Sequence, residues 1–125
     1  MSYANAYKKT QAETASPQRL MALLFEAALR HIREGAQDLE ARRTAFRTHF
    51  AKASAIVAEL ARTLDSKQAP ELAEQLGPLY LFVSRRLFVA NLKSDVKAAR
   101  EAERVFAPIA EAFTQAVAQA QAVTP

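Results

Sequence analysis

Residues 46–64 read FRTHFAKASAIVAELARTL, and this stretch decides the fold of the chain. Its large and small apolar residues recur at steps of four, three, four, three and four positions, which places them on one face of a helix. The residues on this stripe are Phe46, Phe50, Ala53, Val57, Leu60 and Leu64. Because such a stripe has to be buried against other elements, the segment predicts one member of a helical bundle.

A similar stripe precedes this segment. The pair Ser16-Pro17 marks the start of a first helix, since a serine side chain can accept a hydrogen bond from the first free N–H groups and proline loses no bond at the first helical position. This helix is expected to run from Pro17 to about Ala41. Gly35 lies inside it, and we expect it to allow the close approach of a neighbouring helix.

Two further amphipathic segments follow, over residues 70–91 and 95–117. Four such helices joined by short connections predict an all-α, antiparallel four-helix bundle. No alternating run bounded by turn residues indicates a strand. The expected organisation is a single domain, 1–125, made of a flexible N-terminal arm (1–15), the bundle (16–117) and a frayed tail (118–125).

Two prolines and one serine predict local features of these later helices. Gly77-Pro78 predicts a kink or a short break in the third helix, because proline removes one backbone hydrogen bond and clashes with the preceding turn. Pro108 predicts a bend in the fourth helix. Ser94 is expected to cap the start of the fourth helix, with Asp95 placed favourably at its positive end.

Composition narrows the class of protein. The chain has 125 residues and no cysteine, which excludes disulfides, thiol nucleophiles and cysteine metal sites. The N-terminal residues lack the apolar core of a signal peptide, and no run is long and apolar enough to span a membrane. We therefore expect a cytoplasmic protein.

Candidates for chemistry are few. The two histidines, His31 and His49, fall on different predicted helices without an evident third ligand, so no metal site is expected. His31 fits better as a hydrogen-bonded core residue on an apolar helix face. No phosphate loop, dinucleotide motif or nucleophile elbow is present. We expect no catalytic residue, no cofactor and no enzymatic activity.

The third helix carries more apolar surface than a bundle helix needs. On a helical wheel, Leu79, Val83, Leu87 and Ala90 share one face with Tyr80 beside them, a typical core stripe. On nearly the opposite face lie Leu81, Phe88 and Leu92, with Phe82 and Val89 on one flank. Because the outer side of a helix in so small a bundle is normally in water, this second face predicts a binding surface.

Three occupants of the second face are compatible with the sequence. It can form a groove for an apolar peptide, it can pair with a second copy in a homodimer, or it can be covered by the N-terminal arm. The last is compatible with the first, since an arm can cover a groove until a partner displaces it.

The net charge of +4 allows a different class of function. A basic helical adaptor could bind an acidic partner or nucleic acid, provided that its arginines converge on one face. The doublets Arg42-Arg43 and Arg85-Arg86 are the candidates. Their scattered positions favour solvated helix faces, and no nucleic-acid partner is expected.

Several short stretches of the sequence form a recognisable series. The arm and first helix contain Tyr3-Ala4-Asn5-Ala6-Tyr7, Thr14-Ala15-Ser16-Pro17, Leu20 and Phe25-Glu26-Ala27-Ala28. The third and fourth helices contain Leu79-Tyr80, Arg86-Leu87, Ala90-Asn91 and Asp95. In their order and spacing, these stretches resemble the FliS family of flagellin export chaperones over nearly the whole chain.

The resemblance implies a function that composition does not show. Family members bind the disordered C-terminal segment of flagellin, prevent its premature polymerisation and keep it competent for flagellar type III export. Family members also interact with the export gate protein FlhA. Transferred to this chain, the partner-binding residues are Tyr3, Tyr7, Leu81, Phe82, Arg85, Phe88 and Leu92. The two tyrosines would lie on an arm that covers the groove, whereas Asn91 and Asp95 fit a structural role at the turn between helices.

Overall fold

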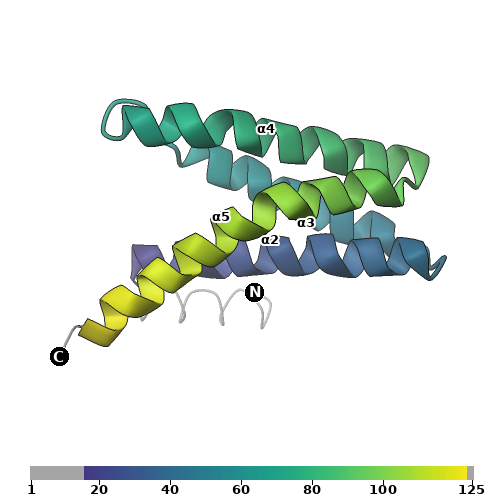
Figure 1. Cartoon of the computed structure of the whole chain (residues 1–125), viewed down its shortest axis with the longest axis horizontal. Helices are drawn as coiled ribbons and strands as arrows, with labels where there is room; N and C mark the ends of the chain where they lie inside the picture. Colours follow the sequence, from purple (N-terminus) through teal and green to yellow (C-terminus); the bar gives the residue numbers. More distant parts are fainter. Residues whose placement is uncertain (1–15, 124–125) are drawn as a thin grey trace, which may run out of the picture.

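The computed structural model describes residues 16–123, which form four helices. These are α2 (Pro17–Glu40), α3 (Phe46–Arg62), α4 (Pro70–Lys93) and α5 (Val96–Val123). Successive helices run in opposite directions (Figure 1). No strand occurs within this part of the chain. The predicted all-α bundle is confirmed.

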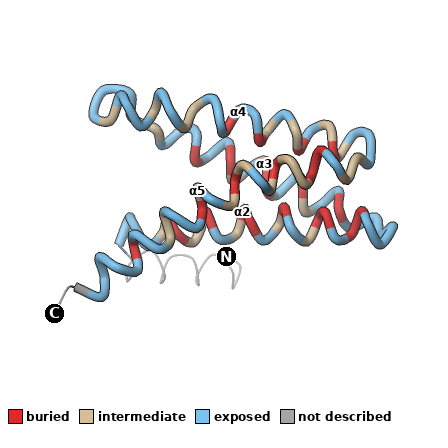
Figure 2. Tube along the Cα trace, in the orientation of Figure 1, coloured by how far each residue is buried: buried red, intermediate tan, exposed pale blue. Residues whose placement is uncertain are grey.

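Each helix packs against two neighbours. α2 contacts α3 and α5, and α4 contacts the same two helices. Figure 2 shows the buried positions turned toward the space between the helices. The largest fully buried side chains are Phe25, Phe50, Phe106, Ile32, Leu60, Leu87, Val57 and Val83. The stripe of residues 46–64 is buried from Phe46 to Leu60, while Leu64 lies beyond the end of α3 and is half-buried.

Local hydrogen bonds define both ends of α2. The Arg19 N–H donates a hydrogen bond to the Ser16 hydroxyl oxygen at 3.1 Å, which confirms the predicted cap. At the other end Arg42 adopts a left-handed conformation, with φ 58°. The Arg43 N–H donates to the Asp38 carbonyl at 2.8 Å, so this end forms a Schellman-type turn.

The prolines within α4 and α5 leave these helices unbroken. The short break considered at Gly77-Pro78 does not occur. A physical reason is that Gly77 lacks the Cβ which would clash with the ring of a following proline in a helical conformation. Pro78 still removes one backbone hydrogen bond of the helix, and the packing of the rest of α4 compensates for this loss.

The turn between α4 and α5 differs from the prediction. Ser94 has a φ of 52° and ends α4, so it does not cap α5 as expected. The cap is Asp95, whose Oδ1 accepts a hydrogen bond from the Ala98 N–H at 3.2 Å. Because Ser94 has to reverse the chain, the next residue takes the capping role. The structural role expected for Asp95 is thereby confirmed. α5 then continues to Val123, beyond the predicted end at Val117.

Candidate partner-binding surface

The inner face of α4 forms part of the core. Tyr80, Val83, Leu87 and Ala90 are all at most 2% exposed. Burial raises the pKa of the Tyr80 phenol to about 12, so this side chain is neutral at physiological pH. These residues fix the rotation of α4 about its own axis, and with it the side chains that point outward.

The outer face of α4 exposes the second apolar set. The exposed fractions are 50% for Leu81, 37% for Phe82, 66% for Phe88 and 65% for Leu92. Arg85 is also exposed and lies between Leu81 and Phe88 in the sequence. We call Leu81, Phe82, Arg85, Phe88 and Leu92 the outer face of α4. The prediction that this helix has one buried and one exposed apolar side is confirmed.

Leu79 was expected in the core stripe, and this prediction is wrong. Its side chain is 39% exposed, and Leu72, two turns earlier, is 49% exposed. The cause lies in α5, which crosses the bundle obliquely and moves away from the first half of α4 toward α2 (Figure 1). The first half of α4 is therefore less covered by α5 than the second half, and more apolar surface is exposed than the helical wheel indicated.

The arginine doublets do not form a free basic patch. Arg43 Nε donates to Asp38 at 2.9 Å, and Arg86 Nη2 donates to Glu101 at 3.3 Å. One member of each doublet is thus paired with a carboxylate of the chain, while Arg42 and Arg85 are exposed. These pairs weaken the reading of the chain as a basic adaptor.

The predicted residues Tyr3 and Tyr7 lie outside the described residues. Asn91 was expected at the turn between helices, but it lies inside α4. Its backbone carbonyl accepts a hydrogen bond from Arg47 Nη1 at 3.2 Å, so this position helps to hold α3 against α4. The bond does not involve the Asn91 side chain.

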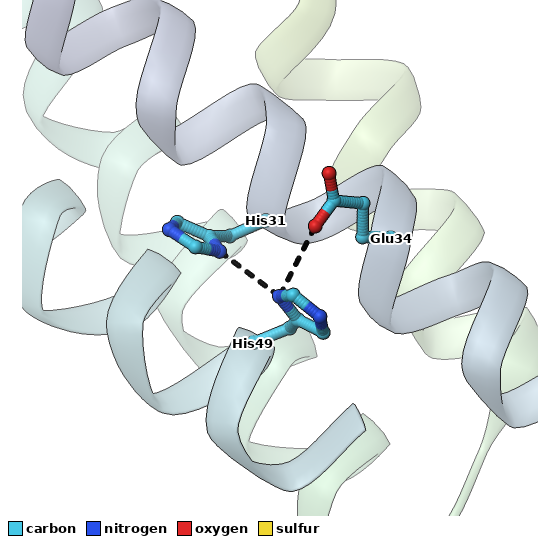
Figure 3. A group of neighbouring side chains, drawn as sticks. All are labelled: His31, Glu34 and His49. Carbon is cyan, nitrogen blue, oxygen red and sulfur yellow. Dashed lines mark hydrogen bonds and ion pairs between the residues drawn. The ribbon is translucent and has the colours of Figure 1, made fainter. Parts of the chain in front are cut away.

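The two histidines come from different helices, as predicted, and the structure makes them neighbours. Their Nδ1 atoms are 3.0 Å apart, and Glu34 Oε2 lies 3.5 Å from Nδ1 of His49 (Figure 3). Both rings are only partly buried, so His31 is not a fully enclosed core residue. Sequence reasoning missed Glu34. The three-residue step from His31 to Glu34 puts them on one helix face, but the pairing with His49 depends on how α2 and α3 meet.

None of the helices in the described part of the chain combines the length and hydropathy needed to cross a membrane. The fold and the outer face of α4 together define the class: a small all-helical bundle with an exposed apolar surface on one helix.

The family follows from comparison with known proteins. The family model described as Flagellar protein FliS matches residues 1–120, and the chain belongs to this family. The chain is 32% identical to the flagellar secretion chaperone FliS of Campylobacter jejuni over 112 residues, which cover 89% of this chain and 88% of that protein. It is also 32% identical to the flagellar secretion chaperone FliS of Bacillus subtilis over 117 residues, 90% of this chain and 84% of the relative. The same identity relates it to the Salmonella typhimurium protein of that name over 115 residues, 90% of this chain and 85% of the relative.

The resemblance seen in the sequence is confirmed by these matches. Membership of a family of secretion chaperones argues for a binding role, in agreement with the expectation of a non-enzymatic protein.

Proposed function

We propose that this chain is a cytoplasmic flagellin-specific export chaperone. It binds the disordered C-terminal segment of flagellin, prevents premature polymerisation and keeps flagellin competent for flagellar type III export. The single observation that carries this proposal is the outer face of α4, where Leu81, Phe88 and Leu92 are each at least half exposed. Exposed apolar residues on a helix of a small bundle lower the solubility of the protein. A binding function accounts for their exposure.

The energetics of this face suit a disordered partner. A flexible segment loses conformational entropy when it becomes ordered on a surface. It recovers free energy from buried apolar area at roughly 25 cal/mol per Å². Exposed leucine and phenylalanine side chains on a preformed helix supply that area, and no cofactor is needed.

The face also favours an amphipathic segment over a purely apolar one. Arg85 is exposed, and within residues 16–123 its guanidinium forms none of the ion pairs with the acidic side chains. A segment with apolar residues at helical spacing and one acidic group could contact Phe88 and Leu92 and pair with Arg85.

Two further parts of the proposal concern the arm and the export machinery. We expect the segment with Tyr3 and Tyr7 to cover the outer face of α4 until flagellin displaces it. We also expect the chaperone to contact the export gate protein FlhA, with the same tyrosines as candidate contacts.

The decisive experiment is a calorimetric titration of the full chain with the C-terminal segment of flagellin from the same organism, at two salt concentrations. We expect one-to-one binding with a negative heat-capacity change and little dependence on salt, because the contact is mainly apolar. Steep weakening by salt would instead favour the basic adaptor. Absence of binding at both salt concentrations would refute the proposed partner, and sedimentation of the free chain would then show whether the outer face of α4 forms a homodimer.

A further inference from the structure

The cluster of His31, Glu34 and His49 lies at the interface of α2 and α3. Figure 3 shows the three side chains turned toward one another, His31 and Glu34 from one turn of α2 and His49 from α3. One nitrogen or oxygen of each lies within 4.8 Å of the others. The outer face of α4 contains none of these residues, so the proposed chaperone function leaves the cluster unused.

Hydrogen bonds within the cluster leave either the Glu34 carboxylate or one ring nitrogen without a partner from the other two residues. Nδ1 of His49 faces both Nδ1 of His31, at 3.0 Å, and Oε2 of Glu34, at 3.5 Å. A single proton on that nitrogen can be donated to one of these two acceptors but not to both. If His49 lacks this proton, its lone pair faces the carboxylate. A cation placed between the three atoms would satisfy every lone pair at once.

The surroundings of the two rings differ. Burial, together with the nearby positive charge of Arg30, lowers the pKa of the His31 imidazole from its ordinary value. On His49, Nε2 lies 3.6 Å from Oδ2 of Asp38. The negative carboxylate favours the proton on Nε2 and leaves the lone pair on Nδ1, the atom that faces the cluster.

Asp38 is itself held in place. Its side chain is mostly buried, and its Oδ1 accepts a hydrogen bond from Arg43 Nε at 2.9 Å. The chain Arg43–Asp38–His49 therefore resembles the carboxylate–histidine arrangement that orients imidazole ligands in metal sites.

Two of the three separations between the donor atoms fit a common ion. Two ligand atoms that are each about 2.1 Å from a common ion lie about 3.0 Å apart at a right angle and about 3.4 Å apart at a tetrahedral angle. The 3.0 Å between the two Nδ1 atoms and the 3.5 Å between His49 Nδ1 and Glu34 Oε2 lie close to these values, and all three donors lie within 4.8 Å of one another. Small rotations of the Glu34 side chain, which is 44% exposed, would bring its oxygen to coordination distance.

We propose that His31, Glu34 and His49 form a binding site for a divalent transition-metal ion that links α2 to α3. Two imidazoles and one carboxylate favour Zn²⁺, Ni²⁺ or Cu²⁺ over Mg²⁺ and Ca²⁺, which prefer oxygen ligands. With three protein ligands, at least one coordination position stays open to water or to a group from another molecule. The ion binds the folded chain, in which α2 and α3 meet, and so stabilises it against unfolding.

The test is titration of the untagged full chain with ZnCl₂, followed by calorimetry and by nuclear magnetic resonance of the imidazole nitrogens. The chain has only 2 histidines, so each imidazole signal can be assigned by one substitution. We expect one Zn²⁺ per chain with micromolar affinity, simultaneous shifts of both Nδ1 signals, and a higher thermal unfolding midpoint. MgCl₂ at the same concentrations should cause none of these changes.

Variants separate the site from adventitious binding. His31→Gln and Glu34→Gln should each weaken Zn²⁺ binding by about tenfold or more, as loss of a ligand does. Glu26→Gln, an exposed carboxylate on the same helix, is the matched control and should leave binding unchanged. Circular dichroism of each variant checks that the bundle is folded, and Glu34→Gln guards against a folding defect because its side chain is largely exposed. Binding weaker than millimolar, or binding that survives His31→Gln, would overturn the proposal and leave the cluster as a hydrogen-bonded pair of histidines.

Discussion

Gly35 of α2 lies directly against the ring of Phe50 of α3. A Cβ atom added at Gly35 would lie 2.5 Å from Cε1 and 2.8 Å from Cδ1 of that ring. Phe50 is fully buried, so its ring has little room to move. The close approach expected at this glycine is confirmed, and it explains why a residue with poor helix propensity occupies the middle of α2.

The first prediction follows from this contact. Gly35→Ala should destabilise the chain, because the overpacking cost of about 1–3 kcal/mol exceeds the gain in helix propensity of about 1 kcal/mol. Urea unfolding measures the difference. The control is the same substitution in a Phe50→Leu background, which lacks the ring carbons Cε1 and Cζ that the added Cβ would meet. An equal effect of Gly35→Ala in the two backgrounds would show that the Phe50 ring can move aside.

The second prediction concerns the end of α2. Arg42 is exposed and has a φ of 58°, a conformation that costs energy in any residue with a Cβ. Arg42→Gly should therefore raise the free energy of unfolding by roughly 0.5–1 kcal/mol. The control is Arg104→Gly, an exposed position within α5, which should lower it by about 1 kcal/mol. A loss of stability on Arg42→Gly would mean that the arginine side chain stabilises this turn.

The third prediction concerns pH. Burial raises the pKa of the Glu103 carboxyl, but hydrogen bonds from Arg100 and Arg33 outweigh burial and hold the pKa below its ordinary value of 4.5. The Arg33 Nε to Glu103 Oε2 distance is 3.0 Å, and this pair joins α2 to α5. In the folded chain Glu103 releases its proton more readily than in the unfolded chain, so the pair contributes stability at neutral pH.

This contribution should disappear as the pH falls below 4.5 and through the pKa of the folded state. Glu103→Gln should be less stable than the original chain at pH 7 and should show a flatter loss of stability on acidification. Thermal unfolding at a series of pH values measures both effects. Parallel pH profiles for the two proteins would contradict this account.

The fourth prediction tests the outer face of α4. Phe88 is 66% exposed, so Phe88→Asp should leave the helical content intact. It should nevertheless abolish binding of the flagellin segment, or weaken it by about 30-fold or more, since a central aromatic contact contributes about 2 kcal/mol or more. Ala58→Asp, an exposed site on α3, introduces the same charge and should bind normally. A Phe88→Asp variant that unfolds, or that binds as well as the original chain, would refute the role of this face.

The sequence by itself determined the four helices and the two-sided character of α4. Helix formation and the spacing of apolar residues are local properties with a period of 3.6 residues, so they can be counted along the chain. The exposure of Leu81, Phe88 and Leu92 followed from the same period once one face of α4 was assigned to the core. The family resemblance rested on short sequence motifs in a fixed order and spacing, and these too can be recognised without the tertiary structure.

The tertiary structure alone decided which faces have neighbours. α5 moves away from the first half of α4, and Leu79 in that half is exposed although the helical wheel placed it with the core. Asp95 and not Ser94 caps α5, because Ser94 reverses the chain at the end of α4 and cannot also cap the next helix. The meeting of His31 with His49 depends on the register of α2 against α3. The physical reason is common to all three: contacts between helices depend on crossing angles and register, which arise from the packing of the whole bundle and not from any one segment.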